Sequence, residues 1–316
     1  MQIPPMENSL KVLVTGGSGF VGKAVVAELL ERGHEVTATT RNTANALVAH
    51  PNLSWIRWDA VKQSLPDADW TQLDTILHLA VPPGPFIFPD ANEILFQLEV
   101  DASFRLLEIA RRHKFKSILF ASTGDVLGSE PEPAAEDNRR YAPSSFYGTV
   151  KTCMELLARA YEPLLFTTAL RFYHPYGPGG EKFLINRLLE QVGERREICI
   201  EGEDGILLNP VWVGDLASGI VLAAENPQKG ILHFAGPEIL TLRELVQKIA
   251  QLLDVTPVLR HIPGECIQRH AGKFEKTAAL LGYSPQVRMQ EGLERLLETG
   301  PYSKFKKIHT GKSVKI

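Results

Sequence analysis

The first half of the chain alternates short apolar runs with segments whose apolar residues recur at helical spacing. A short apolar run between turns predicts a buried strand, and recurrence every three or four residues predicts an amphipathic helix. The expected strands are Lys11–Thr15, Glu35–Thr40, Leu53–Trp58, Thr75–Leu79, Ser117–Ser122 and Thr167–Phe172. The expected helices are Gly22–Arg32, Asn92–His113 and Phe146–Tyr161. Because such alternation is typical of βαβ units, we predict an α/β fold of Rossmann type, with a doubly wound parallel sheet.

Beyond about residue 170 the pattern loosens, which indicates a smaller C-terminal substrate-binding lobe. Thr241–Leu253 is its best helix, because Thr241 and Glu244 have the spacing of a capping box. The other expected elements are helices Lys182–Val192 and Asp215–Ala224, strands Glu197–Glu201 and Ile231–Ala235, and a closing helix from Gln290.

These elements predict a division of the chain into two parts and a tail. Residues 10–172 and 206–235 are expected to form the Rossmann domain, and residues 173–205 and 236–300 the substrate lobe. Residues 301–316 are expected to form a basic tail, since five lysines and few apolar residues lie between Tyr302 and Ile316. A solvated segment is the simpler interpretation of this tail, and a docking arm for a partner is the alternative.

Composition narrows the class of protein without naming a function. The 316 residues are 44% apolar and 22% charged, which is ordinary for a soluble globular protein. A formal net charge of −3 gives no reason to expect binding to nucleic acid or to an anionic membrane. No apolar run approaches the roughly 20 residues of a membrane span, and no signal peptide is evident, so we expect a cytoplasmic protein. The three cysteines are too few and too widely spaced for a disulfide framework or a metal site.

A glycine-rich loop follows the first strand and opens the first helix. Its sequence, TGGSGFVG, places Gly16 and Gly19 in the turn, and Gly22 where the helix packs on the sheet. Free N–H groups at a helix N-terminus bind phosphate, and glycines allow the backbone to approach a pyrophosphate. The loop therefore predicts dinucleotide binding, with Phe20 and Val21 beside the phosphates; a plain glycine turn is the alternative.

The end of the second strand carries the signal for the choice between NAD and NADP. An acidic residue there would bind the ribose hydroxyls of NAD, whereas this chain has Thr39, Thr40 and Arg41. NAD(P) is therefore the expected cofactor, with a slight preference for NADP. Asp59 and Ala60, after the third strand, are placed to meet the adenine.

Tyr147 and Lys151 lie four residues apart on a predicted helix, so both face the same side. A tyrosine is a poor base near neutral pH because its pKa is about 10, and a neighbouring ammonium favours its phenolate. Ser122 and Thr123 end the fifth strand, at the sheet edge where ligands bind in this class of fold. A hydroxyl there can bind the reacting oxygen while the tyrosine moves a proton.

These motifs together resemble the extended short-chain dehydrogenase/reductase family, in its NAD-dependent epimerase/dehydratase group of nucleotide-sugar-modifying enzymes. The resemblance covers roughly residues 10–298. The segments that carry it are TGGSGFVG (residues 15–22), HLA (78–80), STGDVLG (122–128), YGTVK (147–151), RFYHPYGPG (171–179), NPVWVGDLASGI (209–220) and LLGYSP (280–285).

The resemblance implies roles for particular residues. Thr123, Tyr147 and Lys151 match the family's catalytic hydroxyl, its acid/base and the lysine that activates the tyrosine and binds the ribose. The residues that match the cofactor-lining segments are Leu79, Ala80, Val81, Ser122, Tyr173 and His174. The family also implies a homodimer formed through the helices Asn92–His113 and Phe146–Tyr161.

Several positions depart from the family pattern. The dehydratase subgroup has an Asp-Glu pair after the catalytic threonine, where this chain has Gly124 and Asp125; Asp125 alone could act as an acid. Leu208 stands where many nucleotide-sugar enzymes have an arginine that grips the diphosphate. Arg187, Arg260 and Arg269 are candidate substitutes, and the expected substrate-binding residues are Thr123, Asp125, His174 and Asn209.

The leading hypothesis is an NAD(P)-dependent epimerase/dehydratase-type enzyme that acts on a nucleotide-activated sugar by transient hydride transfer, without a metal. An NADPH-dependent ketoreductase acting on another small carbonyl substrate is the first alternative, favoured by Arg41 and by the missing arginine. A non-catalytic sensor that binds a dinucleotide is the second alternative, and the intact Thr123, Tyr147 and Lys151 set argues against it.

Overall fold

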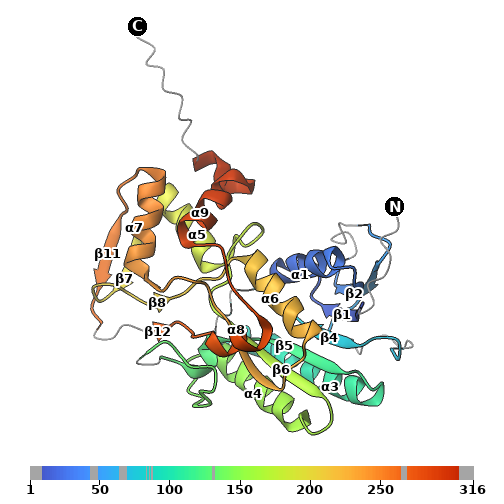
Figure 1. The fold of residues 1–316 in the computed structure, drawn as a ribbon. Coiled ribbons are helices and arrows are strands. Elements are labelled where there is room, and N and C mark those ends of the chain that lie inside the picture. The colour runs from blue at the N-terminus through green and yellow to red at the C-terminus, as the bar shows by residue number, and fades with distance from the viewer. Residues whose placement is uncertain are drawn as a thin grey trace.

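The computed structural model describes residues 9–42, 49–63, 70–82, 84, 86, 88–129, 132–264 and 269–305. Its main element is a seven-stranded, all-parallel sheet with the order β3-β2-β1-β4-β5-β6-β9 (Figure 1). The chain winds outward from β1 in one direction and from β4 in the other, so the predicted doubly wound Rossmann-type sheet is confirmed. The strands are β1 (Lys11–Thr15), β2 (Glu35–Thr40), β3 (Leu53–Arg57), β4 (Thr75–His78), β5 (Ser117–Thr123), β6 (Phe166–Phe172) and β9 (Gly230–Phe234).

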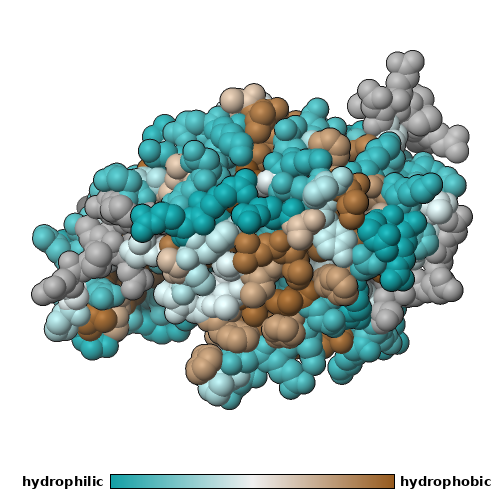
Figure 2. Space-filling view, turned by 90° about the horizontal axis from the view of Figure 1, so that it is seen from below, coloured by the Kyte–Doolittle hydropathy of each residue, from teal (hydrophilic) through white to brown (hydrophobic). Residues whose placement is uncertain are grey.

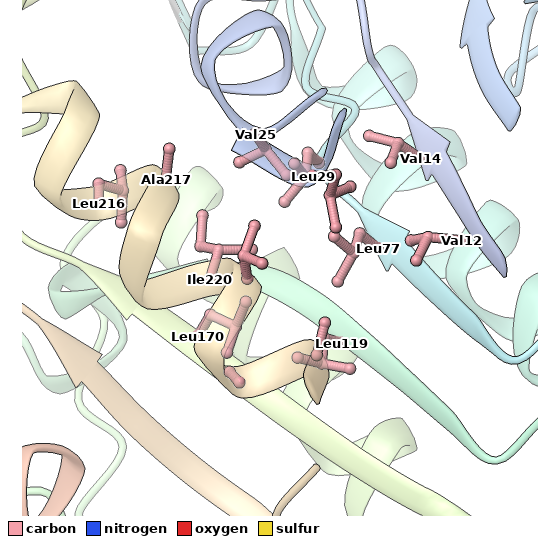
Figure 3. Close-up of a cluster of buried hydrophobic side chains, with 14 of the residues drawn as sticks. Val12, Val14, Val25, Leu29, Leu77, Leu119, Leu170, Leu216, Ala217 and Ile220 are labelled. Carbon is pink, nitrogen blue, oxygen red and sulfur yellow. The ribbon is translucent and has the colours of Figure 1, made fainter. Parts of the chain in front are cut away.

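Helices cover both faces of this sheet. Figure 3 shows α1 (Phe20–Glu31) and α6 (Val213–Glu225) packed on one face, where their apolar side chains meet those of β1, β4, β5 and β6. Val12 and Val14 point to this face, whereas Leu13 belongs to the cluster on the other face. This alternation is the period of two that a strand imposes on its side chains. The opposite face is covered by α3 (Ser103–Arg112) and α4 (Phe146–Tyr161).

The predicted helix Asn92–His113 is not a continuous α-helix. It begins as α2 (Asn92–Phe96), passes through a π-helical stretch, η2 (Gln97–Ala102), and continues as α3. A π-helical stretch inserts an extra residue into the helical turn and rotates the side chains that follow it. The apolar spacing of the sequence does not reveal such an insertion, because the buried stripe continues on both sides of it.

The smaller lobe, at the upper left of Figure 1, has its own core. This core is built from α5 (Leu184–Gly193), α7 (Leu242–Leu253) and α9 (Met289–Glu298), next to the parallel pair β7 (Ile198–Glu201) and β11 (Leu259–Ile262). A three-stranded sheet joins β8 (Leu207–Leu208), β10 (Leu240–Thr241) and β12 (Arg269–His270). The predicted capping box of α7 is present: Glu244 N donates to Thr241 Oγ1 at 3.1 Å, and Thr241 N donates to Glu244 Oε2 at 2.8 Å.

Two segments differ from the predicted division of the chain. Helix α8 (Glu275–Leu281) belongs by sequence to the predicted lobe, but Leu281 packs in the core beside the large sheet. The predicted solvated tail begins too early, because the 3-10 helix η4 (Gly300–Phe305) buries Tyr302 in the lobe core, with Phe305 packed against it. Aromatic burial outweighs the basic composition there. The remaining predictions for the tail, from residue 306 onward, lie outside the described residues.

Among the described residues, no helix is both long and apolar enough to cross a membrane. In the same part of the chain, histidine, cysteine and acidic side chains form no group of three or more that could hold a metal ion.

Candidate functional site

A cavity of about 1410 Å³ opens at the carboxyl ends of the parallel strands, between the large sheet and the smaller lobe. It includes the ends of β1 and β4, where the winding of the sheet changes direction; ligands of open α/β sheets bind at this switch point. The predicted cofactor and catalytic residues all line it: Gly16, Gly19, Phe20, Val21, Gly22, Arg41, Asp59, Ala60, Leu79, Ala80, Val81, Ser122, Thr123, Tyr147, Lys151, Tyr173 and His174.

The glycine loop leaves no room for side chains on its inner side. A Cβ on Gly16, which has a φ of 71°, would lie 2.6 Å from Ala80 Cα, and one on Gly22 would lie 2.1 Å from Gly16 O. Helix α1 begins beside this loop, and its N-cap residue Gly19 offers no side-chain oxygen to the first-turn N–H groups. The first turn also carries no acidic residue. An anionic pyrophosphate fits these free donors and the positive end of the helix dipole.

The ends of β2 and β3 form one side of the cavity. Thr40 Oγ1 lies 2.9 Å from Ser18 Oγ, which ties the glycine loop to β2, and the Arg41 side chain is exposed at the rim. Asp59 Oδ1 accepts a hydrogen bond from Val61 N at 3.1 Å, and this bond fixes the turn after β3.

Helix α4 brings Tyr147 and Lys151 into the cavity. Ser145 caps the helix by accepting a hydrogen bond from Gly148 N at 3.0 Å, which fixes the first turn that carries Tyr147. The Tyr147 ring stacks on Phe86 with centroids 5.0 Å apart, and Lys151 Nζ lies 5.7 Å from the centroid of the tyrosine ring. Burial raises the pKa of Tyr147 well above its usual value, and the charges of Glu99 and Asp125 raise it further.

The two hydroxyls at the end of β5 have different partners. Thr123 Oγ1 accepts a hydrogen bond from Asp125 N at 3.2 Å, and a hydrogen bond from the Thr123 side chain also helps to lower the pKa of the Asp125 carboxyl at the cavity wall. Ser122 Oγ donates to Glu155 Oε1 at 2.5 Å, and this carboxylate also binds Arg171 in a bidentate pair beneath the sheet edge. The Ser122 hydroxyl is therefore committed to the protein interior, although the residue lines the cavity.

Three polar side chains gather on the lobe side of Thr123. Asp125 Oδ1 lies 3.4 Å from His270 Nδ1, and the rings of His270 and His174 meet edge to face. Burial acts to raise the pKa of Asp125, but the hydrogen bond and charge of His270 outweigh it and lower the pKa. Burial lowers the pKa of His174 to about 4, so His174 is neutral near pH 7. Hydrogen-bond acceptors and donors are thus grouped at one end of the cavity.

Asn209 does not belong to this site, which corrects its assignment as a substrate residue. Its buried side chain donates to Gly272 O at 2.8 Å and accepts from Gly272 N at 3.1 Å, so it fixes the backbone between β12 and α8. Tyr173 lines the cavity with its ring, but its hydroxyl lies 3.3 Å from His233 Nδ1 in the interior. The polar groups of both residues therefore form hydrogen bonds inside the protein, which their positions in the sequence do not indicate.

The three candidate substitutes for the missing arginine differ in their position relative to the cavity. Arg187 lines the cavity on α5, together with Lys182 just before that helix. Arg260 is exposed on β11 and pairs with Glu197 Oε1 at 2.7 Å, away from the cavity. The side chain of Arg269 lies outside the described residues, and Leu208 is fully buried in β8.

Some cavity residues carried no usable sequence signal. Phe86 lies in a segment without periodicity, and His270 is about 145 residues from its partner Asp125 in the chain. Only the path of the chain brings β12 beside the end of β5.

Comparisons with known proteins agree with this geometry. The model of the "NAD dependent epimerase/dehydratase family" matches residues 12–234. A probable UDP-glucuronate 4-epimerase of Rhizobium meliloti (strain 1021) is 26% identical over 352 residues, covering 95% of this chain and 99% of that protein. UDP-glucuronic acid decarboxylase 1 of Arabidopsis thaliana is 25% identical over 307 residues, covering 91% of this chain and 69% of the relative. The crystal structure of a UDP-glucose 4-epimerase of Thermus thermophilus in complex with NAD is 26% identical, with a TM-score of 0.75, and covers 91% of this chain and 97% of that one.

Proposed function

Because the chain belongs to the NAD-dependent epimerase/dehydratase family, we propose that it modifies a nucleoside-diphosphate sugar, with Tyr147 as the acid/base of the reaction. The observation that carries this proposal is the meeting of Thr123, Tyr147 and Lys151 in the cavity bounded by the glycine loop. The comparisons favour this enzyme class over the ketoreductase and over the non-catalytic sensor. The named relatives act on uridine-diphosphate sugars or uronic acids, which makes these the first candidate substrates.

Thr123, Tyr147 and Lys151 have different roles in removing the proton from the sugar hydroxyl. Thr123 Oγ1 donates a hydrogen bond to the reacting sugar oxygen and orients it toward Tyr147. The Tyr147 phenolate takes the proton from that hydroxyl, and the Lys151 ammonium stabilises the phenolate. A dinucleotide held by the glycine loop supplies the hydride acceptor for the adjacent carbon.

Lys182 and Arg187 are the candidate grip for the diphosphate. Both line the cavity on its lobe side, and neither forms an ion pair within the described ranges. An arginine binds phosphate oxygens through two parallel donors, so Arg187 can replace the arginine that the family pattern places at Leu208.

The acidic side chains after Thr123 favour epimerisation over dehydration. A 4,6-dehydration needs an acid and a base beyond the tyrosine, and the residue after Thr123 is Gly124. A Cβ on Gly124 would lie 2.5 Å from the Tyr173 ring, so the backbone there has no room for a second carboxylate. Asp125 remains as a single acid, paired with His270.

We propose NAD as the resident cofactor. The slight preference for NADP that Arg41 suggests is not supported by the solved relative, which holds NAD. The exposed Arg41 side chain is free to turn toward solvent, and an enzyme that restores its own cofactor each cycle gains nothing from NADPH. Mass spectrometry of the nucleotide released on denaturation tests this choice: NAD or NADH supports it, and NADP or NADPH contradicts it.

We further propose that the protein forms a homodimer through α3 and α4. Figure 2 shows hydrophobic side chains gathered on the underside of the molecule, where Figure 1 places these two helices. Phe96, Phe104 and Leu156 are large apolar residues of this helix pair and the segment leading into it, and all three are half exposed. Exposed apolar patches of this kind on a soluble protein mark protein–protein contacts.

Replacement of Tyr147 by phenylalanine tests the acid/base assignment. We expect Tyr147→Phe to fold, to bind NAD, and to lose at least about a hundredfold in turnover of uridine-diphosphate sugars, followed by proton NMR of the sugar ring. Tyr161→Phe is the matched control, because Tyr161 lies on the same helix and donates to Glu108 outside the cavity. Full turnover in folded Tyr147→Phe would overturn the proposal.

A further inference from the structure

Glu99 is a fully buried carboxylate that the proposed reaction does not use. It lies in the π-helical stretch η2, and its Oε2 is 2.6 Å from Lys151 Nζ. The same ammonium donates to Ala121 O at 2.7 Å. Lys151 is therefore held from two sides, by Glu99 of η2 and by the backbone of β5.

The π-helical turn explains why an acidic residue can point inward here. Glu99 and its neighbour Leu98 are both buried, whereas Asp101 in the same stretch is exposed and pairs with Arg105 at the surface. The extra residue of the turn directs Glu99 toward α4 without disturbing the apolar stripe that continues into α3.

The pairing matters because the negative charge of Glu99 offsets the positive charge of Lys151, which is the charge that stabilises the Tyr147 phenolate. Burial raises the pKa of Glu99, and the charge and hydrogen bond of Lys151 act against this rise, so the ionised carboxylate depends on its 2.6 Å pairing with the ammonium that it compensates. Among the described residues, the titratable groups facing this pair are His78 from β4 and Tyr147 from α4, and Asp125 faces Tyr147 from the turn after β5. Burial lowers the pKa of His78 to about 3, with a further contribution from Lys151, so His78 is neutral.

We infer that Glu99 is a positioning residue of the catalytic pair, which holds the Lys151 ammonium in place and opposes ionisation of the Tyr147 phenol. The inference rests on the proposed role of Tyr147. Glu99 does not touch the reacting atoms; it acts through Lys151 and through its own charge. The site consequently contains three coupled groups, and the carboxylate sets how far the ammonium favours the phenolate.

The direction of the effect follows from the signs of the charges. Removing the negative charge of Glu99 ends its repulsion of the phenolate and leaves the Lys151 ammonium uncompensated beside the phenol. Both effects favour the phenolate. Glu99→Gln should therefore let Tyr147 ionise at a lower pH. Glu99→Asp keeps the charge and should leave the ionisation close to that of the natural protein.

The test is an absorbance titration of the phenol in protein freed of dinucleotide. Each protein is compared with its Tyr147→Phe counterpart, so that the difference at the tyrosinate wavelength reports this phenol among the seven tyrosines. We expect ionisation in Glu99→Gln at least about one pH unit below the natural protein, and in Glu99→Asp within about half a unit of it. A purely structural role for Glu99 would not move this titration, so an unchanged or raised midpoint in Glu99→Gln overturns the inference.

A second neutral variant covers the case in which Glu99→Gln does not fold. Glu99→Asn is shorter and leaves space for water to solvate the ammonium, and the same lowering of the midpoint is expected. The ascending limb of kcat/KM against pH should move in the same direction in both variants. A limb that stays in place while the phenol midpoint also stays in place would contradict the inference a second time.

The two proposals fail in different ways. If Tyr147→Phe keeps its turnover, the acid/base assignment fails, whatever the titration shows. If Tyr147→Phe is inactive and the phenol midpoint ignores the charge at position 99, the assignment of Tyr147 stands and the role of Glu99 fails.

Discussion

Gly22 is the residue at which the fold of the phosphate loop is most sensitive to a single methyl group. A Cβ at this position would lie 2.1 Å from the carbonyl oxygen of Gly16, so the loop must move to admit it. We predict that Gly22→Ala lowers the affinity for NAD at least tenfold, about 1.4 kcal/mol, because the displaced loop no longer presents its N–H groups to the pyrophosphate. Isothermal titration calorimetry measures the loss.

Lys23→Ala is the matched control for this substitution. Lys23 is the next residue of α1, its side chain is exposed, and it does not line the cavity. Its affinity for NAD should stay within about twofold of the natural protein. Equal affinities for Gly22→Ala and Lys23→Ala would show that the loop does not hold the dinucleotide.

At the residue scale, what could be predicted from the sequence depended on local spacing. The glycine loop and the pair Tyr147 and Lys151 are local patterns, and the structure places them in one cavity. The burial of Glu99 could not be predicted, because spacing in the sequence does not reveal a π-helical turn. His270 meets Asp125 only through the path of the chain, which no local pattern contains.

At the scale of elements, α3 and α4 carry the prediction of a dimer. Leu156 lies half exposed on α4. If α4 forms an interface, a glutamate placed at this position would lose its solvating water there, which is costly for a charged group. We predict that Leu156→Glu shifts the protein from dimer to monomer, or weakens the dimer at least about a hundredfold, in sedimentation at micromolar concentration. The effect should come without loss of helix content, because the side chain is not part of the monomer core.

Ile239→Glu serves as the comparison, since Ile239 is equally exposed but lies before β10 in the smaller lobe. It should sediment like the natural protein. If both variants remain dimeric, the half-exposed residues of α3 and α4 do not form the interface.

Long periodic elements could be predicted, and short ones could not. The six predicted strands of the large sheet and α4 were found near their expected positions, because burial on both faces makes them continuous apolar runs. β8, β10 and β12 are two residues long, and pairing with one another rather than their own pattern defines them. These short strands bring His270 to the cavity, so the missed elements and the missed site residue have the same origin.

At the scale of the whole molecule, buried histidines link stability to pH. Burial lowers the pKa of His78 and His233 to about 3 and that of His174 to about 4, with the charges of Lys151 and Arg171 acting on the first two. An unfolded histidine titrates near 6.5, so as pH falls the unfolded chain binds these protons first. Stability is therefore complete above about pH 6.5 and is lost as pH falls toward these folded-state values.

We predict that the free energy of unfolding falls steeply between about pH 6 and 5, measured by urea denaturation. Each histidine contributes up to about 1.4 kcal/mol per pH unit, and the raised pKa values of Glu99 and Asp215 act in the opposite direction. His233→Asn should reduce the slope by about one such contribution, whereas His261→Asn, at an exposed position on β11, should leave it unchanged. A stability that does not change over this range would mean that the buried imidazoles take up protons in the folded protein. The cavity that holds His174 would then have to admit water in the absence of ligand.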